Sequence, residues 1–360
     1  MGANNFGTDL FLARQPTGGR LWKAARMTLP RRAGCGLLPG PRRMFASFLT
    51  TIFFSLSVIF AARSARMLGG ARANLARIGL ATGLLAVWAH GFGRGLHGES
   101  LPWFFLSGVI GFGLGDLALF GALTRIGPRL SILLTQCLAA PIAALAEWAW
   151  LGTTLRAADV ACAAVILAGV AVALAPDRGL AVDRRTFWIG ALCGTGSALG
   201  QALGAVVSRK ANDVAALTHL PIDGGTAAYQ RAIGGVLLTA LAFWLMRKRR
   251  AADDAARPAV NWRAAWPFVA ANALAGPTVG VGCYQWALQT TPSGIVLPII
   301  ATAPLITIVL SFFLEGLRPT RRAVLGGLVA VCGAVALKDA QSDWALSKAL
   351  HLKLRFLLNI

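Results

Sequence analysis

The polar residues that could carry chemistry are few and lie inside long apolar stretches. Asp116 is the one acidic residue well inside such a stretch, between residues 111–115 and 117–120. A carboxylate in lipid costs about 3 kcal/mol unless it is paired, protonated or facing water. The residue therefore predicts either a site for a cationic group or a proton, or an ion pair with Arg77 or Arg129 near a helix end. A polar cap at the membrane interface is a further alternative.

Uncharged polar residues extend this candidate site. Serine and threonine often bond to their own helix backbone, whereas a glutamine in lipid needs a partner and therefore faces other helices or water. Gln136 and Gln201 are therefore expected either to line a cavity between helices or to hydrogen-bond from one helix to another. The predicted substrate or coupling-ion site consists of Asp116, Gln136, Gln201, Ser57, Tyr284 and Thr302.

Motifs for metal, cofactor or covalent chemistry are missing from the sequence. The four histidines and six cysteines are scattered, without the spacing of a metal site or a disulfide framework. There is no paired-carboxylate motif and no phosphate-binding loop. We therefore predict no catalytic residue, no metal and no cofactor. An integral-membrane enzyme acting on a lipid-linked substrate, and a passive channel or scaffold, stay as alternatives to a transporter.

Composition places the chain in the membrane. Hydrophobic residues make up 56% of it and charged residues 14%, against about 25% charged residues in soluble domains. The net charge of +21 comes from tails and from short segments between apolar stretches, where basic residues meet lipid headgroups and set topology. A nucleic-acid partner would need a basic soluble face instead. The sequence predicts an all-α, multi-pass protein of the cell membrane, with lipid as a partner.

Ten apolar segments are long enough to cross a bilayer, which needs about 15–25 residues. Residues 264–314 contain no charge, but a turn composition at 289–294 divides them into two spans. The predicted spans are 44–62, 76–92, 102–123, 130–151, 158–175, 187–207, 226–246, 265–288, 293–314 and 322–337.

Two stretches about 165 residues apart repeat each other. Residues 111–174 match residues 276–337, with Gly111 and Gly115 corresponding to Gly276 and Gly280. Ten spans divide into five plus five, and because five is odd the second copy must enter the membrane from the opposite side. The predicted architecture is an inverted 5+5 repeat.

Glycines and prolines inside the spans have predicted structural roles. Helices can approach closely at Gly-x-x-x-Gly pairs, so a packing role is predicted for Gly111, Gly115, Gly276 and Gly280. A proline frees a backbone carbonyl and kinks a helix. We predict a kink or hinge at Pro141, at its counterpart Pro304, and at Pro277.

The domain organisation follows from these spans. Residues 1–43 carry eight basic residues against one acid and have no periodic apolar face, so disorder is predicted there. The two repeats occupy residues 44–175 and 187–337, and the basic tail 338–360 could form an interfacial helix. Basic loops suggest that the termini are external, whereas the basic tail 1–43 suggests the reverse.

A tandem five-helix unit with a proline in each fourth helix resembles the EamA-like family of the drug/metabolite transporter superfamily. A lone acid at Leu314-Glu315-Gly316 and a Gly-rich last helix strengthen this resemblance, although the first copy has Leu151-Gly152-Thr153-Thr154 at the matching place. The resemblance covers residues 44–338. It implies a central cavity that opens alternately to each side. The implied function is secondary transport of a small metabolite or drug-like solute, driven by protons or by exchange against a counter-solute.

Overall fold

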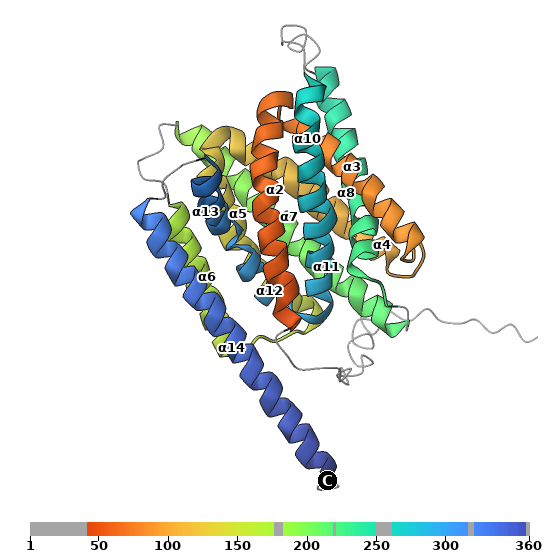
Figure 1. The fold of residues 1–360 in the computed structure, drawn as a ribbon, viewed down its shortest axis with the longest axis vertical. Coiled ribbons are helices and arrows are strands. Elements are labelled where there is room, and N and C mark those ends of the chain that lie inside the picture. The colour runs from red at the N-terminus through yellow and green to blue at the C-terminus, as the bar shows by residue number, and fades with distance from the viewer. Residues whose placement is uncertain (1–41, 176–182, 219–220, 250–260, 316–319, 358–360) are drawn as a thin grey trace, which may run out of the picture. The chain divides into compact units, whose positions relative to one another are not determined.

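The computed structural model describes residues 42–175, 183–218, 221–249, 261–315 and 320–357, and within these residues it contains helices and no strand (Figure 1). The elements are α2 (Arg42–Leu68), α3 (Gly70–Gly91), α4 (Leu101–Gly108), η1 (Val109–Gly115), α5 (Asp116–Leu151), α6 (Ala157–Leu174), α7 (Arg184–Leu217), α8 (Gly224–Arg249), α10 (Trp262–Ala273), η2 (Leu274–Gly280), α11 (Val281–Thr290), α12 (Ser293–Ile300), α13 (Ala303–Glu315) and α14 (Arg321–Leu357). The prediction of an all-helical fold is confirmed for these residues.

Seven described segments are long and apolar enough to span a membrane. They confirm a multi-pass membrane protein. The other three predicted spans fall on α3, on the run from α10 to α11, and on α14. In the second of these, the helix is divided into pieces of 12, 7 and 10 residues. The count of ten spans therefore stays a prediction.

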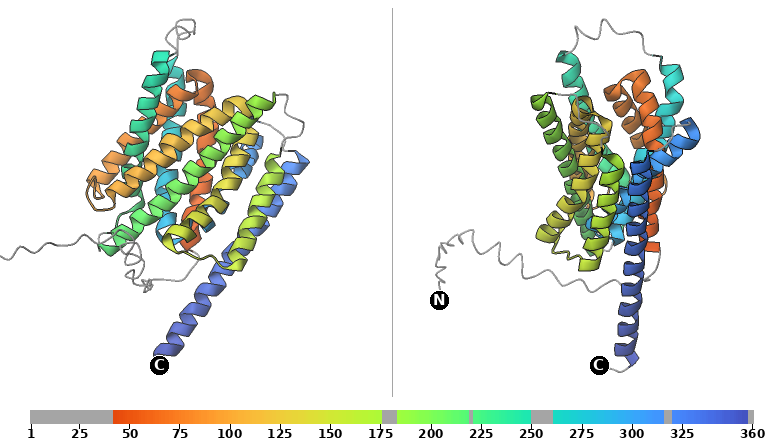
Figure 2. Two further views of the ribbon diagram at one scale, coloured as in Figure 1. Left: turned by 180° about the vertical axis from the view of Figure 1, so that it is seen from behind. Right: turned by 90° about the vertical axis from the view of Figure 1, so that its left-hand side faces the viewer.

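The chain assigned to α5 turns back partway along its length, so that two parts of it pack against α7 (Figure 2, left). Its first part runs antiparallel to α7 and its later part runs parallel to α7. The reversal lies at residues 124–129, whose Arg, Gly and Pro separate two apolar runs. The contacts that trace it are Gly121 with Cys193, Ile126 with Gly190, and Leu134 with Gly194.

Two π-helices occupy matching places in the sequence repeat. η1 begins at Val109 and η2 at Leu274, which are 165 residues apart, and both contain seven residues. Pro277 lies inside η2, but η1 contains no proline, so the proline is not what creates this backbone form. π-Helical turns inside α-helices are rare and are frequent at functional sites.

The packing between helices has the same two-fold pattern. α2 packs against α10, η2 and α11, whereas α7 packs against α4, η1 and α5. α3 packs against α8, and α6 lies beside α14 (Figures 1 and 2). Each first helix therefore contacts the π-helix of the other half of the chain.

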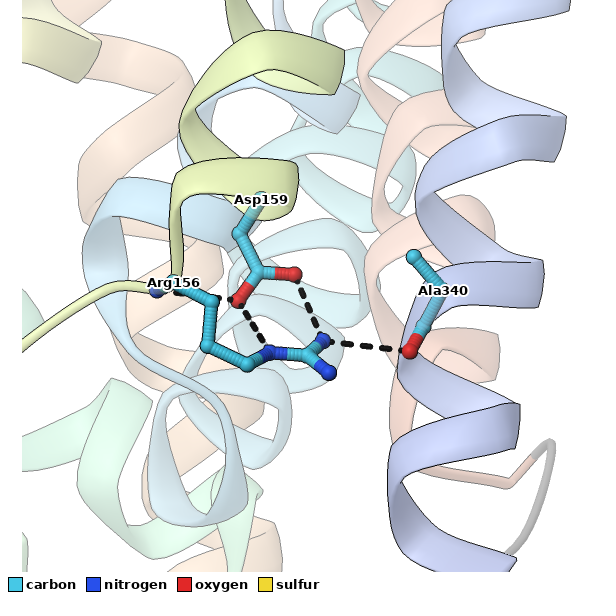
Figure 3. Close-up of polar contacts among 3 residues, drawn as sticks. All are labelled: Arg156, Asp159 and Ala340. Carbon is cyan, nitrogen blue, oxygen red and sulfur yellow. Dashed lines mark hydrogen bonds and ion pairs between the residues drawn. The ribbon is translucent and has the colours of Figure 1, made fainter.

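An ion pair at the start of α6 joins it to α14 (Figure 3). Arg156 donates from Nε and Nη2 to the two carboxylate oxygens of Asp159, at 3.0 and 2.8 Å. The same Nη2 donates to the backbone oxygen of Ala340 at 3.1 Å. Asp159 is buried while Arg156 is half-exposed, so this contact fixes α6 against α14 at the edge of the bundle.

Some predicted features lie outside the described residues. Residues 1–41 of the basic tail belong to this group, as do Gly316 of the predicted Leu-Glu-Gly signature and the three residues after it. The backbone of α14 continues as one helix to Leu357.

Candidate substrate site

Asp116 forms an ion pair across two helices. It lies where η1 passes into α5, and its Oδ2 is 3.3 Å from Nη2 of Arg77 on α3. The side chains are 22% and 21% exposed, respectively, so the pair is partly desolvated. Arg77 also donates from Nε to Asn74 Oδ1 at 2.7 Å. Arg77, one of the two arginines expected beside Asp116, is therefore bonded to it.

Arg231 on α8 is the most deeply buried cation near this pair, with 4% of its surface exposed. Its Cζ lies 4.8 Å from the ring centroid of Phe112 and 5.4 Å from that of Tyr284. The guanidinium Nε and Nη1 are buried and form no hydrogen bond. Electrostatic attraction to aromatic faces stabilises a desolvated cation by about 2 kcal/mol.

Glycines make room for Arg231. A Cβ atom at Gly111 would lie 2.4 Å from Arg231 Nη2, and one at Gly108 would lie 1.8 Å from the Arg231 backbone oxygen. Gly200 and Gly204 of α7 also approach the backbone of η1. Gly115, for which a packing role was predicted, lies against Gly200 where α7 packs on η1.

Ser57 joins the other π-helix. Its hydroxyl donates to Asn272 Oδ1 at 2.7 Å, and a Cβ atom at Gly276 would lie 2.3 Å from Ser57 Oγ. Gly280 lies against Phe54, whose ring is 6.4 Å from that of Tyr284. Asn272 is fully buried, and its Nδ2 has no hydrogen-bond partner. The structure thus places Asp116 and Tyr284 near Arg231, and Ser57 next to η2.

The remaining predicted polar residues bond elsewhere. Gln201 Nε2 donates to Gln136 Oε1 at 3.1 Å, which links α7 to α5. Thr302 donates to the backbone oxygen of Ile299 at 2.6 Å, in the short break between α12 and α13.

The three predicted kink prolines have different surroundings. Pro304 is the second residue of α13, directly after that break, whereas Pro141 lies inside the later part of α5 and is exposed. Pro277 is buried within η2. Their role as hinges stays a prediction.

Sequence reasoning missed a second buried ion pair. Arg209 Nε donates to Glu147 Oε1 at 3.1 Å, and both side chains are 2% exposed. Arg209 Nη1 also donates to the Leu288 oxygen at 2.7 Å. Glu147 Oε2 accepts from both the backbone nitrogen and the hydroxyl of Ser293. The predicted sixth span ended at residue 207, so Arg209 was outside it.

Polar contacts also close the end of the bundle where α8 begins. Trp88 Nε1 donates to Asp223 Oδ1 at 2.9 Å, and His90 Nε2 lies 3.3 Å from the Tyr229 hydroxyl. Burial opposes ionisation of Asp223, yet hydrogen bonds from Thr226, Trp88 and Gly225 hold its pKa below the ordinary value. Within the described residues, no cluster of His, Cys, Asp or Glu could hold a metal ion.

The apolar spans and the buried charges between them define a helical, multi-pass membrane protein. Residues 188–337 match the model of the EamA-like transporter family. This match confirms the predicted resemblance to the family for these residues, which lie in the second predicted repeat.

Comparison with solved structures gives the fold. One chain, described only as the crystal structure of a protein, superposes with a TM-score of 0.62 at 21% sequence identity. The match covers 82% of this chain and 96% of that one. No curated protein sequence matches the chain.

Proposed function

We propose that the protein is a secondary active transporter that moves a small organic solute across the cell membrane by alternating access. Its two halves, residues 44–175 and 187–337, would form an inverted repeat of five helices each. The family match supports transport, and the matched π-helices with their reciprocal packing support the repeat. In transporters built this way, the substrate site lies between the halves, near the middle of the bilayer.

The paired π-helices carry this proposal. Irregular backbone at membrane depth is tolerated only where protein buries it or where it lines a cavity. η1 and η2 each pack against the first helix of the other half, and Arg231 and Ser57 bring polar groups to them. A rocking motion of one half against the other would therefore change the surroundings of both π-helices at once.

Asp116 is the proposed coupling residue. It is the acidic member of the ion pair with Arg77, and it lies directly after η1. Movement of α3 relative to α5 would break this pair and leave the carboxylate open to a proton. A solute exchanged in the opposite direction is the alternative driving partner.

The test uses the purified full chain in liposomes loaded with a small-molecule extract of the cells that produce it. Mass spectrometry of the outside medium would identify solutes that leave faster than they leave protein-free liposomes. We expect one solute, or a few related ones, with saturable flux that external extract accelerates. Flux that does not saturate indicates a channel, and a chemically altered solute indicates an enzyme. Either of these results, or no flux at all, would contradict the proposal.

A further inference from the structure

The charges around Asp116 do not balance. Within the described residues, Asp116 has two arginines in its neighbourhood: Arg77 in direct contact, and Arg231 close enough for electrostatic attraction. The separate pair of Glu147 and Arg209 is neutral as a unit. One positive charge at the centre of the bundle is therefore left without a matching anion.

Arg231 is the residue that holds this surplus. Asp116 is hydrogen-bonded to Arg77 rather than to Arg231, and the Nε and Nη1 donors of Arg231 are buried without acceptors. A buried charged donor without an acceptor is costly, and an ionisable residue inside the membrane usually marks a substrate or ion path. The surrounding glycines and aromatic rings hold the side chain in place, and although the Tyr284 hydroxyl attracts the guanidinium, Nε and Nη1 form no hydrogen bond.

We propose that Arg231 binds the carboxylate of the transported solute, and that this solute is a monoanionic organic acid with an apolar or aromatic body. The proposal rests on the transport function above and names its substrate class. The N–H groups of a guanidinium lie in one plane and match the two oxygens of a carboxylate. One surplus positive charge is neutralised by one carboxylate, whereas a phosphate dianion would reverse the imbalance.

The neighbours of Arg231 fit the rest of such a solute. Phe112 and Tyr284 present aromatic rings on two different helices, and Phe54 extends this apolar surface from α2. An apolar body would pack on the rings while the carboxylate takes the donors of Arg231.

The first experiment measures thermal unfolding of the purified full chain in a detergent that has neither phosphate nor carboxylate. The probes are acetate, benzoate and phenylacetate, each compared with its primary amide, and inorganic phosphate. We expect at least one carboxylate to raise the unfolding midpoint, and its amide and phosphate to have little effect. Equal effects of acid and amide, a larger effect of phosphate, or no response to any carboxylate would overturn the proposal.

Two arginine variants separate a binding role from a structural one. Arg231→Gln should unfold at the same or a higher temperature than the wild type without ligand, because it removes a buried charge that lacks acceptors. It should lose the carboxylate response. The matched control is Arg209→Gln, which strands Glu147: we expect a lower midpoint and an intact response. If Arg231→Gln is the unstable variant, or if it still responds to the carboxylate, Arg231 does not bind the solute.

Flux distinguishes failure of this inference from failure of the transport function. In liposomes, the concentration for half-maximal exchange of the active carboxylate should rise about 10- to 100-fold in Arg231→Gln, as expected for loss of charge-assisted hydrogen bonds. Saturable exchange that does not distinguish acid from amide would leave transport standing and overturn the role of Arg231. Carboxylate binding without any exchange would support the site but contradict transport.

Discussion

Replacing Glu147 by glutamine should destabilise the protein strongly. The carboxylate accepts hydrogen bonds from Arg209 and from two groups of Ser293, in surroundings where both charged side chains are 2% exposed. Glutamine keeps the shape but removes the negative charge. Arg209 then retains its bond to the Leu288 oxygen and loses its counter-ion.

The magnitude follows from this burial. Breaking a buried pair by removing one partner costs about 3–5 kcal/mol, because the other charge stays buried without compensation. In larger domains, each kcal/mol of lost stability lowers the unfolding midpoint by about 2–4 °C. The expected fall of the midpoint in Glu147→Gln is therefore at least about 6 °C. Replacing both residues, as in Glu147→Gln with Arg209→Met, should recover most of this loss, since an apolar replacement of a buried pair is often neutral.

The assay is thermal unfolding in detergent of the wild type, the two single variants and the double variant, with unfolding followed by loss of helical signal. This cycle isolates the interaction between the two side chains. The surface variant Asp183→Asn serves as a control: it removes only an exposed negative charge at the N-cap of α7, where the Asp183 side chain accepts from the Thr186 nitrogen at 2.9 Å. An unchanged midpoint in Glu147→Gln would refute the reasoning, as would a double variant less stable than both single ones.

Four further predictions follow from the contacts above. Gly200→Ala should lower the unfolding midpoint because its Cβ would lie 2.5 Å from a backbone atom of η1, whereas Gly83→Ala, with no atom within 4 Å, should be neutral or stabilising. Asp116→Asn should lower the free energy of unfolding by about 1–2 kcal/mol, as expected for loss of a partly buried ion pair. Transport by this variant in liposomes should no longer depend on pH, and unchanged pH-dependent flux would exclude a coupling role. Because folding lowers the pKa of Asp223, its ionised carboxylate stabilises the folded state at pH 7, and this stabilisation is lost as the pH falls below about 4. The unfolding midpoints of the wild type and Asp223→Asn should therefore differ at pH 7 and become equal in acid. A chain that starts at Met44 should still insert into membranes, which fractionation would show, because residues 1–43 have no apolar periodicity.

Much of the fold could be predicted because glycine and proline mark backbone positions that other residues fill poorly. Gly111 and Gly276 are corresponding residues of the sequence repeat, and the starts of the two π-helices are separated by the same number of residues. Helix ends were predicted less well. A span predicted from apolarity ends where a charged residue follows, so the sixth predicted span ended before Arg209. In the structure, Glu147 neutralises Arg209, and α7 continues to Leu217.

The candidate site could be predicted only in part. A lone acid in an apolar segment stands out in any sequence, and Arg77 was one of two possible partners for Asp116. Arg231 resembled a simple counterpart of Arg77 near a span end. Its burial depends on Gly108 and Gly111, which come from another helix, and on rings from two further elements. Such a site is created by packing, and a single sequence does not show which side chains face each other.

The inverted arrangement of the two halves can be tested directly by labelling from one side of the membrane. The six native cysteines would be replaced by alanine, and a single cysteine placed either at Glu99, before α4, or at Arg263, at the start of α10; both positions are exposed. Five predicted spans separate them, so a membrane-impermeant thiol reagent should label one from outside right-side-out vesicles and the other only from outside inverted vesicles. Labelling of both cysteines from the same side would contradict an inverted repeat and, with it, the proposed site between the two halves.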